Sequence, residues 1–316
     1  MALVHFEEVY IFWILNHVLA LLKDICQNRL ARKHTWPVDL STKEEMHEKE
    51  YPLVTDLRDR QYLRLRSLQT FQGRQRTGNY LIEGIRHLAR AVEESAPIEQ
   101  LFVDPSIFSN RFGQKLVRKL RRAGTPGIRL APTLYRDLTL AAEPQGVGAV
   151  LRQHWSSIDI TPIRQEALWL AVESVDQPGN LGTIIRTAEA AGVEGIFLLG
   201  PSIDPWDPGC VRATMGSLFA QRLIQCTSRE LVNWARSHHV SMIGSSPHGL
   251  LDYKTLRSRW PAVLLVGSER HRLSEVLMGA SNFLTRIPMC GRADSINAAV
   301  ATGVLLFELS VQLRMN

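Results

Sequence analysis

Five short apolar runs, separated by helix-like stretches, constrain the fold of the second half of the chain more than any other feature. They cover residues 168–175, 195–199, 240–244, 263–266 and 284–287. The runs are mostly apolar and lack the regular alternation of a strand with one wet face, which is typical of parallel strands covered by helices on both sides. The sequence therefore predicts an open α/β domain over residues 163–316, in which ligands bind at the carboxyl ends of the strands.

The composition is that of a folded protein with a polyanionic partner. The 316 residues are 45% hydrophobic and 22% charged, which allows a sizeable core and two domains. Lysine and arginine total 37 against 31 acidic residues, and the resulting net charge of +6 suits a polyanion, although a merely basic protein shows the same balance. Four cysteines lie far apart without metal-ligand spacing, so we expect no metal site and a reducing, cytoplasmic location; they are Cys26, Cys210, Cys226 and Cys290.

Residues 1–50 are interpreted as an N-terminal extension and a linker. Residues 9–22 are strongly apolar, but this run is too short to span a bilayer and follows Glu7 and Glu8 rather than basic residues. We interpret it as an amphipathic or core-packing helix, with a membrane-surface role as the alternative. Residues 43–50 are almost wholly polar, which is typical of a linker. No membrane partner is expected.

An arginine-rich segment opens the region between residues 51 and 152. Its six arginines precede a strand-like run that ends in Glu83 and Gly84, and they are Arg58, Arg60, Arg64, Arg66, Arg74 and Arg76. Helix-like and strand-like stretches then alternate, which predicts a small α/β domain. Guanidinium groups bind phosphates through paired hydrogen bonds, so we predict nucleic-acid contacts for the last four of these arginines, Arg64, Arg66, Arg74 and Arg76. For any single arginine, a solvated helix face with a local ion pair is the alternative.

Three blocks of residues follow predicted strands in the second half of the chain. The first is Asn180-Leu181-Gly182-Thr183-Ile184-Ile185-Arg186-Thr187-Ala188, the second is Gly267-Ser268-Glu269, and the third runs from Ile287-Pro288-Met289 to Ser295-Ile296-Asn297. Because the carboxyl ends of parallel strands lie at one edge of a sheet, we expect the three blocks to meet there.

Each of two helices in this region has a predicted start and a predicted packing face. Asn180 is expected to cap the first helix, Gly192 to end it, and Arg186 to lie within two turns of the cap. Its sheet-facing residues are predicted to be Ile184, Ile185, Ala188 and Ala191. Ser295 is expected to cap the final helix. The packing residues of that helix, at helical spacing, are predicted to be Ile296, Val300, Val304, Phe307 and Val311.

The three blocks resemble the three motifs of the SpoU (TrmH-like) family of RNA ribose 2′-O-methyltransferases, in the same order, over residues 167–316. A weaker resemblance, over residues 58–150, is to the separate substrate-binding domain of some members. The resemblance implies a deep trefoil knot in the C-terminal domain, S-adenosylmethionine as cofactor, an RNA substrate and a homodimer. The two-domain layout favours ribosomal RNA, and transfer RNA is the alternative.

The resemblance also implies roles for individual residues. The catalytic set is Arg186, as the family's catalytic arginine, with Asn180, Glu269, Ser295 and Asn297. The cofactor-binding set is Gly267, Ser268, Ile287, Met289, Ile296 and Asn297. Arg212, in a segment similar to one beside the family's active site, is a further candidate for RNA contact, with an ion pair to Asp207 as the alternative.

The second block departs from the family pattern. Arg270 and Arg272 stand where relatives usually have glycines, and arginine tolerates a positive φ far less well, so a differently shaped loop is expected. An RNA-binding protein that has lost the cofactor is therefore one alternative. A dinucleotide-dependent oxidoreductase is another, but no Gly-x-Gly-x-x-Gly follows an early strand with an acidic residue beyond it.

Overall fold

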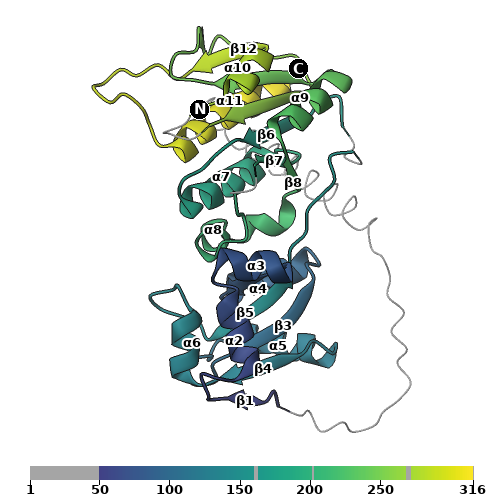
Figure 1. Cartoon of the computed structure of the whole chain (residues 1–316), viewed down its shortest axis with the longest axis vertical. Coiled ribbons are helices and arrows are strands. Elements are labelled where there is room, and N and C mark those ends of the chain that lie inside the picture. Colours follow the sequence, from purple (N-terminus) through teal and green to yellow (C-terminus); the bar gives the residue numbers. More distant parts are fainter. Residues whose placement is uncertain (1–49, 160–162, 201–202, 268–271, 316) are drawn as a thin grey trace, which may run out of the picture. The chain divides into compact units, whose positions relative to one another are not determined.

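The computed structural model describes residues 50–159, 163–200, 203–267 and 272–315. These residues belong to one unit, 50–316, that is separate from residues 1–49. The helix predicted for residues 9–22 and most of the predicted linker lie outside the described residues. The unit contains two sheets, one before and one after residue 160 (Figure 1).

The first sheet has five strands and mixed directions. In spatial order the strands are β1 (Leu53–Val54), β4 (Gly127–Leu130), β3 (Ile98–Val103), β5 (Val147–Arg152) and β2 (Asn79–Glu83). The first three are parallel, and β5 runs antiparallel to both of its neighbours. The helices of this region are α2 (Arg60–Ser67), α3 (Phe71–Thr77), α4 (Ile85–Glu93), α5 (Arg111–Arg122) and α6 (Pro132–Leu138). This arrangement agrees with the predicted small α/β region.

The second sheet has seven strands, and every neighbouring pair is parallel. In spatial order the strands are β10 (Leu251–Asp252), β12 (Phe283–Arg286), β9 (Ser241–Ser245), β11 (Ala262–Val266), β6 (Leu168–Val172), β7 (Ile196–Leu199) and β8 (Leu223–Cys226). The helical elements are α7 (Pro178–Ala191), α8 (Pro208–Ala213), the 3-10 helix η1 (Ser217–Ala220), α9 (Ser228–Ser237), α10 (Glu275–Ala280) and α11 (Ala298–Met315). The parallel sheet predicted from the apolar runs is confirmed.

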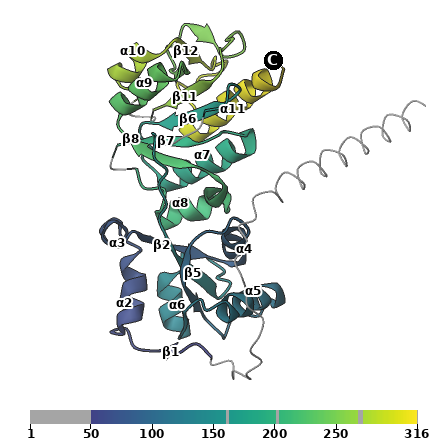
Figure 2. The ribbon, with the colours of Figure 1, turned by 90° about the vertical axis from the view of Figure 1, so that its right-hand side faces the viewer.

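Both faces of the second sheet are covered, as the apolar runs require. Along β6, Leu168 and Leu170 belong to the core shared with α7 and α11, whereas Trp169 belongs to the core shared with α9 and α10. Figure 2 shows the two helix pairs on opposite sides of the sheet. Because successive residues of a strand point to opposite faces, a strand between two apolar layers needs apolar residues at every position. The first of these cores also includes residues of β2 and α4, so it continues into the first sheet.

The final helix, α11, packs differently from the prediction. Its buried face includes Leu305, Leu306 and Leu309, which join the core beside α7. The predicted packing face is wrong: Val300, Phe307 and Val311 are 50–55% exposed, and Val304 is half-buried. By length and composition α11 is the described helix that could cross a membrane. Its contacts with α7, β6 and β11 are those of a core helix.

Candidate active site

The α7 helix places the first block immediately after β6. Pro178 is the first helical residue and Gln177 occupies the N-cap, so Asn180 lies in the first turn and the predicted cap at Asn180 is wrong. Proline is favoured at this first position because its missing N–H has no helical partner there. The end of the helix at Gly192 is confirmed, with the left-handed φ of 79° that glycine adopts easily. The four residues predicted to face the sheet are all buried, as expected: Ile184, Ile185, Ala188 and Ala191.

A hydrogen bond joins the first block to the third. The Asn297 Nδ2 donates to the Asn180 Oδ1 over 3.2 Å, although the two residues are 117 positions apart. The Asn297 Oδ1 accepts from the backbone amides of Ala299, at 2.9 Å, and Val300, at 3.3 Å. Asn297 therefore caps α11, and the cap predicted at Ser295 is wrong. A single side chain both starts the last helix and ties it to the start of α7.

Arg186 is exposed on the second half of α7. No described residue forms an ion pair with its guanidinium, so its hydrogen-bond donors are available to a ligand. Its neighbours Ile184 and Ile185 are fully buried, which fixes the position of the backbone from which Arg186 projects. A cation with free donors on a rigid helix can orient an incoming anion or hydroxyl group.

The second block begins where β11 ends. A Cβ added at Gly267 would lie 2.1 Å from the Arg272 carbonyl oxygen, so the backbone approach at this point excludes every side chain. Ser268, Glu269 and Arg270 lie outside the described residues. Arg272 is described and adopts φ of 50°, in the left-handed region that glycine prefers. The arginine thus adopts the backbone conformation expected of the glycine that it replaces.

The Glu173 carboxylate, which the sequence analysis missed, supports the same edge of the sheet. One oxygen accepts from the Ser274 amide at 2.7 Å, and the other accepts from the Ser228 hydroxyl at 3.1 Å. Glu173 thereby connects the end of β6 to the starts of α9 and α10. A charged residue at the end of an otherwise apolar run is the signal that could have identified it.

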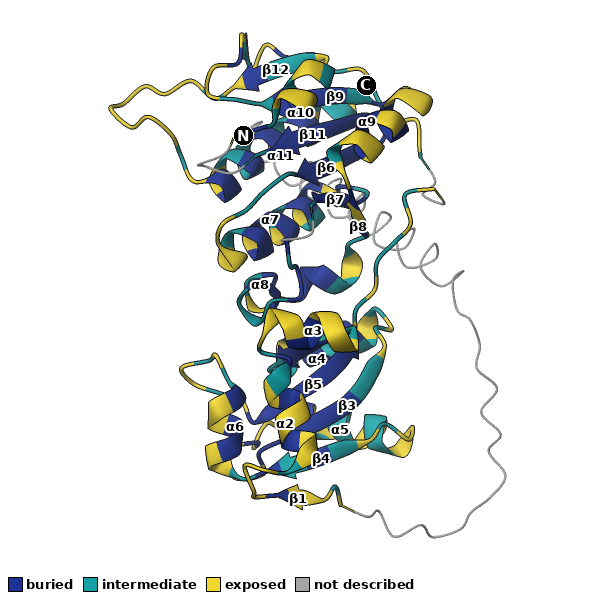
Figure 3. Cartoon of the chain, viewed as in Figure 1, coloured by how far each residue is buried: buried dark blue, intermediate teal, exposed yellow. Residues whose placement is uncertain are grey.

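The third block forms a long exposed loop between β12 and α11. Most of this loop is exposed (Figure 3). Ile287 and Ile296 are half-buried at its two ends, whereas Met289 and Ser295 are exposed. No backbone hydrogen bond links residues 287–296 to any other described residue. Free amides and carbonyls beside apolar side chains fit the edge and faces of an adenine, so this donor set is suited to the predicted cofactor.

Among the arginines predicted to contact RNA, Arg74 is buried instead. Its side chain is 3% exposed, and its guanidinium donates to Asp204 at 2.7 Å and 2.9 Å and to Asp207 at 3.2 Å. Its Nη1 also donates to the Leu68 carbonyl at 2.8 Å. These bonds leave it no access to a phosphate, so the RNA contact predicted for Arg74 is wrong. The ion pairs of Arg74 connect α3, beside the first sheet, to the segment that precedes α8.

The other four arginines remain at the surface. Arg64 lies 3.6 Å from Glu99 and Arg66 lies 3.4 Å from Asp137, which are exposed ion pairs that contribute little to stability. Arg76 is exposed and has no ion pair with a described residue. The Arg212 Nη1 donates to the Leu140 carbonyl at 2.7 Å, whereas Asp207, its alternative partner, pairs with Arg74.

Comparison with known proteins assigns the family. Residues 167–307 match the SpoU rRNA Methylase family, and residues 63–149 match the MRM3-like substrate binding domain. A 23S rRNA (uridine(2479)-2'-O)-methyltransferase from Streptomyces viridochromogenes is 32% identical over 242 residues, which are 74% of this chain and 83% of that relative. The chain belongs to the SpoU rRNA methylase family.

Solved structures of methyltransferases share the fold. An rRNA methyltransferase from Sinorhizobium meliloti, bound to AdoMet, has 32% identity and a TM-score of 0.74, covering 82% of this chain and 97% of that one. A SpoU methyltransferase from Streptomyces viridochromogenes, in complex with the cofactor AdoMet, has 30% identity and a TM-score of 0.76, covering 82% of this chain and 99% of that one. The predicted α/β fold with a parallel sheet is confirmed by this likeness.

Proposed function

We propose that this chain is an S-adenosylmethionine-dependent ribose 2′-O-methyltransferase that acts on ribosomal RNA. The observation that carries the proposal is the hydrogen bond between Asn180 and Asn297, which brings the first and third blocks together beside the carboxyl end of β6. The relatives that are named as 23S rRNA 2′-O-methyltransferases, from Streptomyces viridochromogenes and Bacillus subtilis, support the choice of RNA.

The catalytic work is assigned to the exposed cation on α7. The cofactor, when bound, supplies an electrophilic methyl group, and the chain must present a ribose hydroxyl to it in line. Arg186 either orients this hydroxyl through its N–H donors or, held in place by an RNA phosphate, helps the hydroxyl proton to leave. The other proposed members of the catalytic set are Asn180, Glu269, Ser295 and Asn297.

The cofactor is proposed to bind between the end of β11 and the exposed loop. The free backbone groups of residues 287–296 and the close backbone approach at Gly267 support this position. The proposed contacts are Gly267, Ser268, Ile287, Met289, Ile296 and Asn297. We also propose that this region forms the trefoil knot of the family.

The RNA is proposed to bind to exposed arginine and lysine side chains, most of which lie on the helices beside the first sheet. Arg64, Arg66, Arg76 and Arg212 remain candidates, and α5 adds a basic surface without acidic residues, whose exposed members include Arg111, Lys115, Arg118 and Lys119. Such contacts give salt-dependent attraction that positions RNA without reading its sequence. A cytoplasmic location is proposed as well, and the free thiols of the described cysteines Cys210, Cys226 and Cys290 support it.

A homodimer is proposed to form through α11. The stripe of Val300, Val304, Phe307 and Val311 has the spacing of one helix face, and three of its members are at least 50% exposed. An apolar stripe on an otherwise packed helix is typical of an interface between subunits, and a twofold pair is the commonest oligomer.

Phe307→Glu is expected to convert the dimer into a monomer, because a carboxylate would be buried without a partner in the interface. Sedimentation velocity measures the change. Phe112→Glu is the matched control, since Phe112 is 59% exposed on α5 and lies outside the stripe. A wild-type monomer, or a Phe307→Glu variant that remains dimeric, contradicts the proposed interface.

Mapping of ribose methylation in RNA from cells with and without the protein tests the function. We expect one ribosomal RNA position to lose its methyl group when the protein is absent. Loss at a transfer RNA position would support the alternative substrate, and unchanged methylation in both RNAs would refute the enzyme. Calorimetry with S-adenosylmethionine separates an enzyme from an RNA-binding protein that has lost the cofactor.

A further inference from the structure

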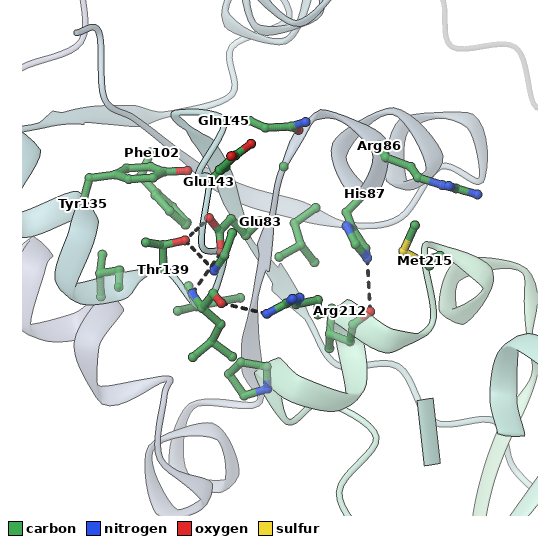
Figure 4. A pocket seen from close by; sticks show the side chains of 18 residues that line it. Glu83, Arg86, His87, Phe102, Tyr135, Thr139, Glu143, Gln145, Arg212 and Met215 are labelled. Atoms are coloured by element: carbon green, nitrogen blue, oxygen red, sulfur yellow. Dashed lines mark hydrogen bonds between the residues drawn. The ribbon is translucent and has the colours of Figure 1, made fainter. Parts of the chain in front are cut away.

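A pocket of about 280 Å³ lies where the end of β2 and the start of α4 face α8 (Figure 4). Its walls are mainly apolar and include Leu81, Phe102, Leu138, Val211 and Met215. None of the proposed catalytic or cofactor-binding residues lines it. We refer to it as the Glu83 pocket, after the carboxylate at its centre.

The Glu83 pocket contains polar groups whose bonding capacity is only partly used. The Glu83 carboxylate accepts from the Thr139 hydroxyl and, at 3.2 Å, from the Leu140 amide. The Gln145 Oε1 accepts from the Ile85 amide at 2.8 Å, which leaves the two Gln145 N–H donors for a ligand. Arg212 uses one guanidinium nitrogen on the Leu140 carbonyl and has two more.

The Tyr135 hydroxyl is the polar group in this pocket that most needs a partner. Tyr135 is 1% exposed and its hydroxyl has no hydrogen-bond partner among the described residues. Burial, with Glu83 and Asp104 nearby, raises the pKa of this phenol, and the Val147 backbone, which opposes the shift, does not reach hydrogen-bond geometry. The hydroxyl therefore stays protonated as a donor. A buried hydroxyl without a partner is unfavourable, and a ligand that accepts a hydrogen bond from it would remove this cost.

We infer that the Glu83 pocket binds one unpaired nucleobase of the RNA substrate, and that it prefers a base with an exocyclic amino group. This inference rests on the proposed function and names a subsite for it. The apolar walls suit the flat faces of a base, the Glu83 carboxylate suits an amino donor, and the Tyr135 hydroxyl suits a ring or carbonyl acceptor. A volume just below about 300 Å³, the lower end for small-molecule sites, suits one base rather than a larger ligand.

The charges around the Glu83 pocket support a base with its phosphates outside. Arg86 and Arg212 line it, and both are exposed enough to meet a phosphate at its mouth. Glu83 and Glu143 disfavour a free anion inside. His87 is buried beside them; burial lowers its pKa, and its Nε2 lies 3.2 Å from the Val211 carbonyl, so it contributes a neutral wall.

Ala141→Trp tests the pocket, because Ala141 lines it and an indole would fill it. Binding of fluorescent ten-nucleotide oligocytidine and oligouridine is measured by anisotropy. The wild-type protein is expected to bind oligocytidine at least about fivefold more tightly, since cytosine carries the amino group that uracil lacks. Ala141→Trp is expected to abolish this preference. Ala142→Trp, at the exposed neighbour that does not line the pocket, is expected to keep it.

Tyr135→Phe is a second variant that keeps the ring and removes only the hydroxyl. Loss of one hydrogen bond is worth about 0.5–1.5 kcal/mol, so oligocytidine affinity is expected to fall by about two- to tenfold. Equal binding of both oligonucleotides by the wild-type protein would overturn the inference, as would a preference that survives Ala141→Trp. If the protein prefers oligocytidine but transfers no methyl group to RNA, the proposed function is refuted and the inference about the pocket stands.

Discussion

Arg186→Ala is expected to lower the rate of methyl transfer by at least about a hundredfold while leaving cofactor affinity unchanged. Removing one preorganised donor from a transition state typically costs about 10²–10³ in rate. Arg186 is exposed on α7 and is not among the proposed cofactor contacts, so its loss should affect the ribose rather than S-adenosylmethionine. Transfer of a radiolabelled methyl group to ribosomal RNA measures the rate, and calorimetry measures cofactor affinity.

Arg229→Ala is the matched control for Arg186→Ala. Arg229 is exposed in the first turn of α9, where a positive charge is unfavourable, so its removal should not destabilise the helix. Arg186→Lys adds a second comparison, because lysine keeps the charge and loses the planar fork. Turnover by Arg186→Ala within about twofold of wild type would remove Arg186 from the proposed role.

Arg74→Met is expected to reduce the free energy of unfolding by about 3 kcal/mol, the lower end of the range for breaking a buried ion pair. Asp204 would keep a charge that is 11% exposed and has lost its partner, whereas Asp207, at 29%, can recover some hydration. The bond from the Arg74 Nη1 to the Leu68 carbonyl would also be lost. Urea denaturation measures the change.

Arg76→Met is the control for Arg74→Met, since both arginines lie on α3 and Arg76 is exposed. Its stability is expected to stay within about 0.5 kcal/mol of wild type, as for most surface substitutions. If Arg74→Met lowers the free energy of unfolding no more than Arg76→Met does, the buried ion pair does not stabilise the fold. We expect Arg76→Met, but not Arg74→Met, to lower the affinity for RNA. This result would show that Arg76 attracts RNA at the surface, whereas Arg74 stabilises the fold.

The strands of the second sheet could be predicted wherever they are central. β6 and β11 are buried at every position, so composition alone identifies them. The two strands at the ends of the sheet were missed: β8 is short and exposes Gln225, and β10 has only two residues. Edge strands are wetted on one side, and their sequences do not carry the continuous apolar signal.

The errors at helix starts have a local cause. Asn180 and Ser295 are both good capping residues, but better-placed competitors lie close by in sequence. Pro178 fits the first helical position and moves the start of α7 back, whereas Asn297 moves the start of α11 forward. The wrong face of α11 has a different cause, because apolar residues occur all around that helix and spacing alone cannot select the buried side.

The burial of Arg74 in an ion pair could not be predicted from the neighbouring residues in the sequence. Its partners Asp204 and Asp207 are 130 and 133 positions away, so nothing near Arg74 distinguishes it from the exposed Arg76. The same limit applies to the bond between Asn180 and Asn297. By contrast, the order of the three blocks was enough to predict the family, because motifs are recognised in the sequence without knowledge of the contacts between them.

One hydrophobic core runs from the first sheet into the second, and it has a consequence for how the modified nucleotide is chosen. Ile82, which lines the Glu83 pocket, and Ile184, two residues before Arg186, belong to the same continuous cluster of buried side chains. The proposed base in the Glu83 pocket and the proposed ribose at Arg186 would then be separated by a fixed distance. If both sites are occupied as proposed, an RNA strand bridges that distance with a set number of nucleotides, and the modified sugar lies a fixed number of nucleotides from the bound base.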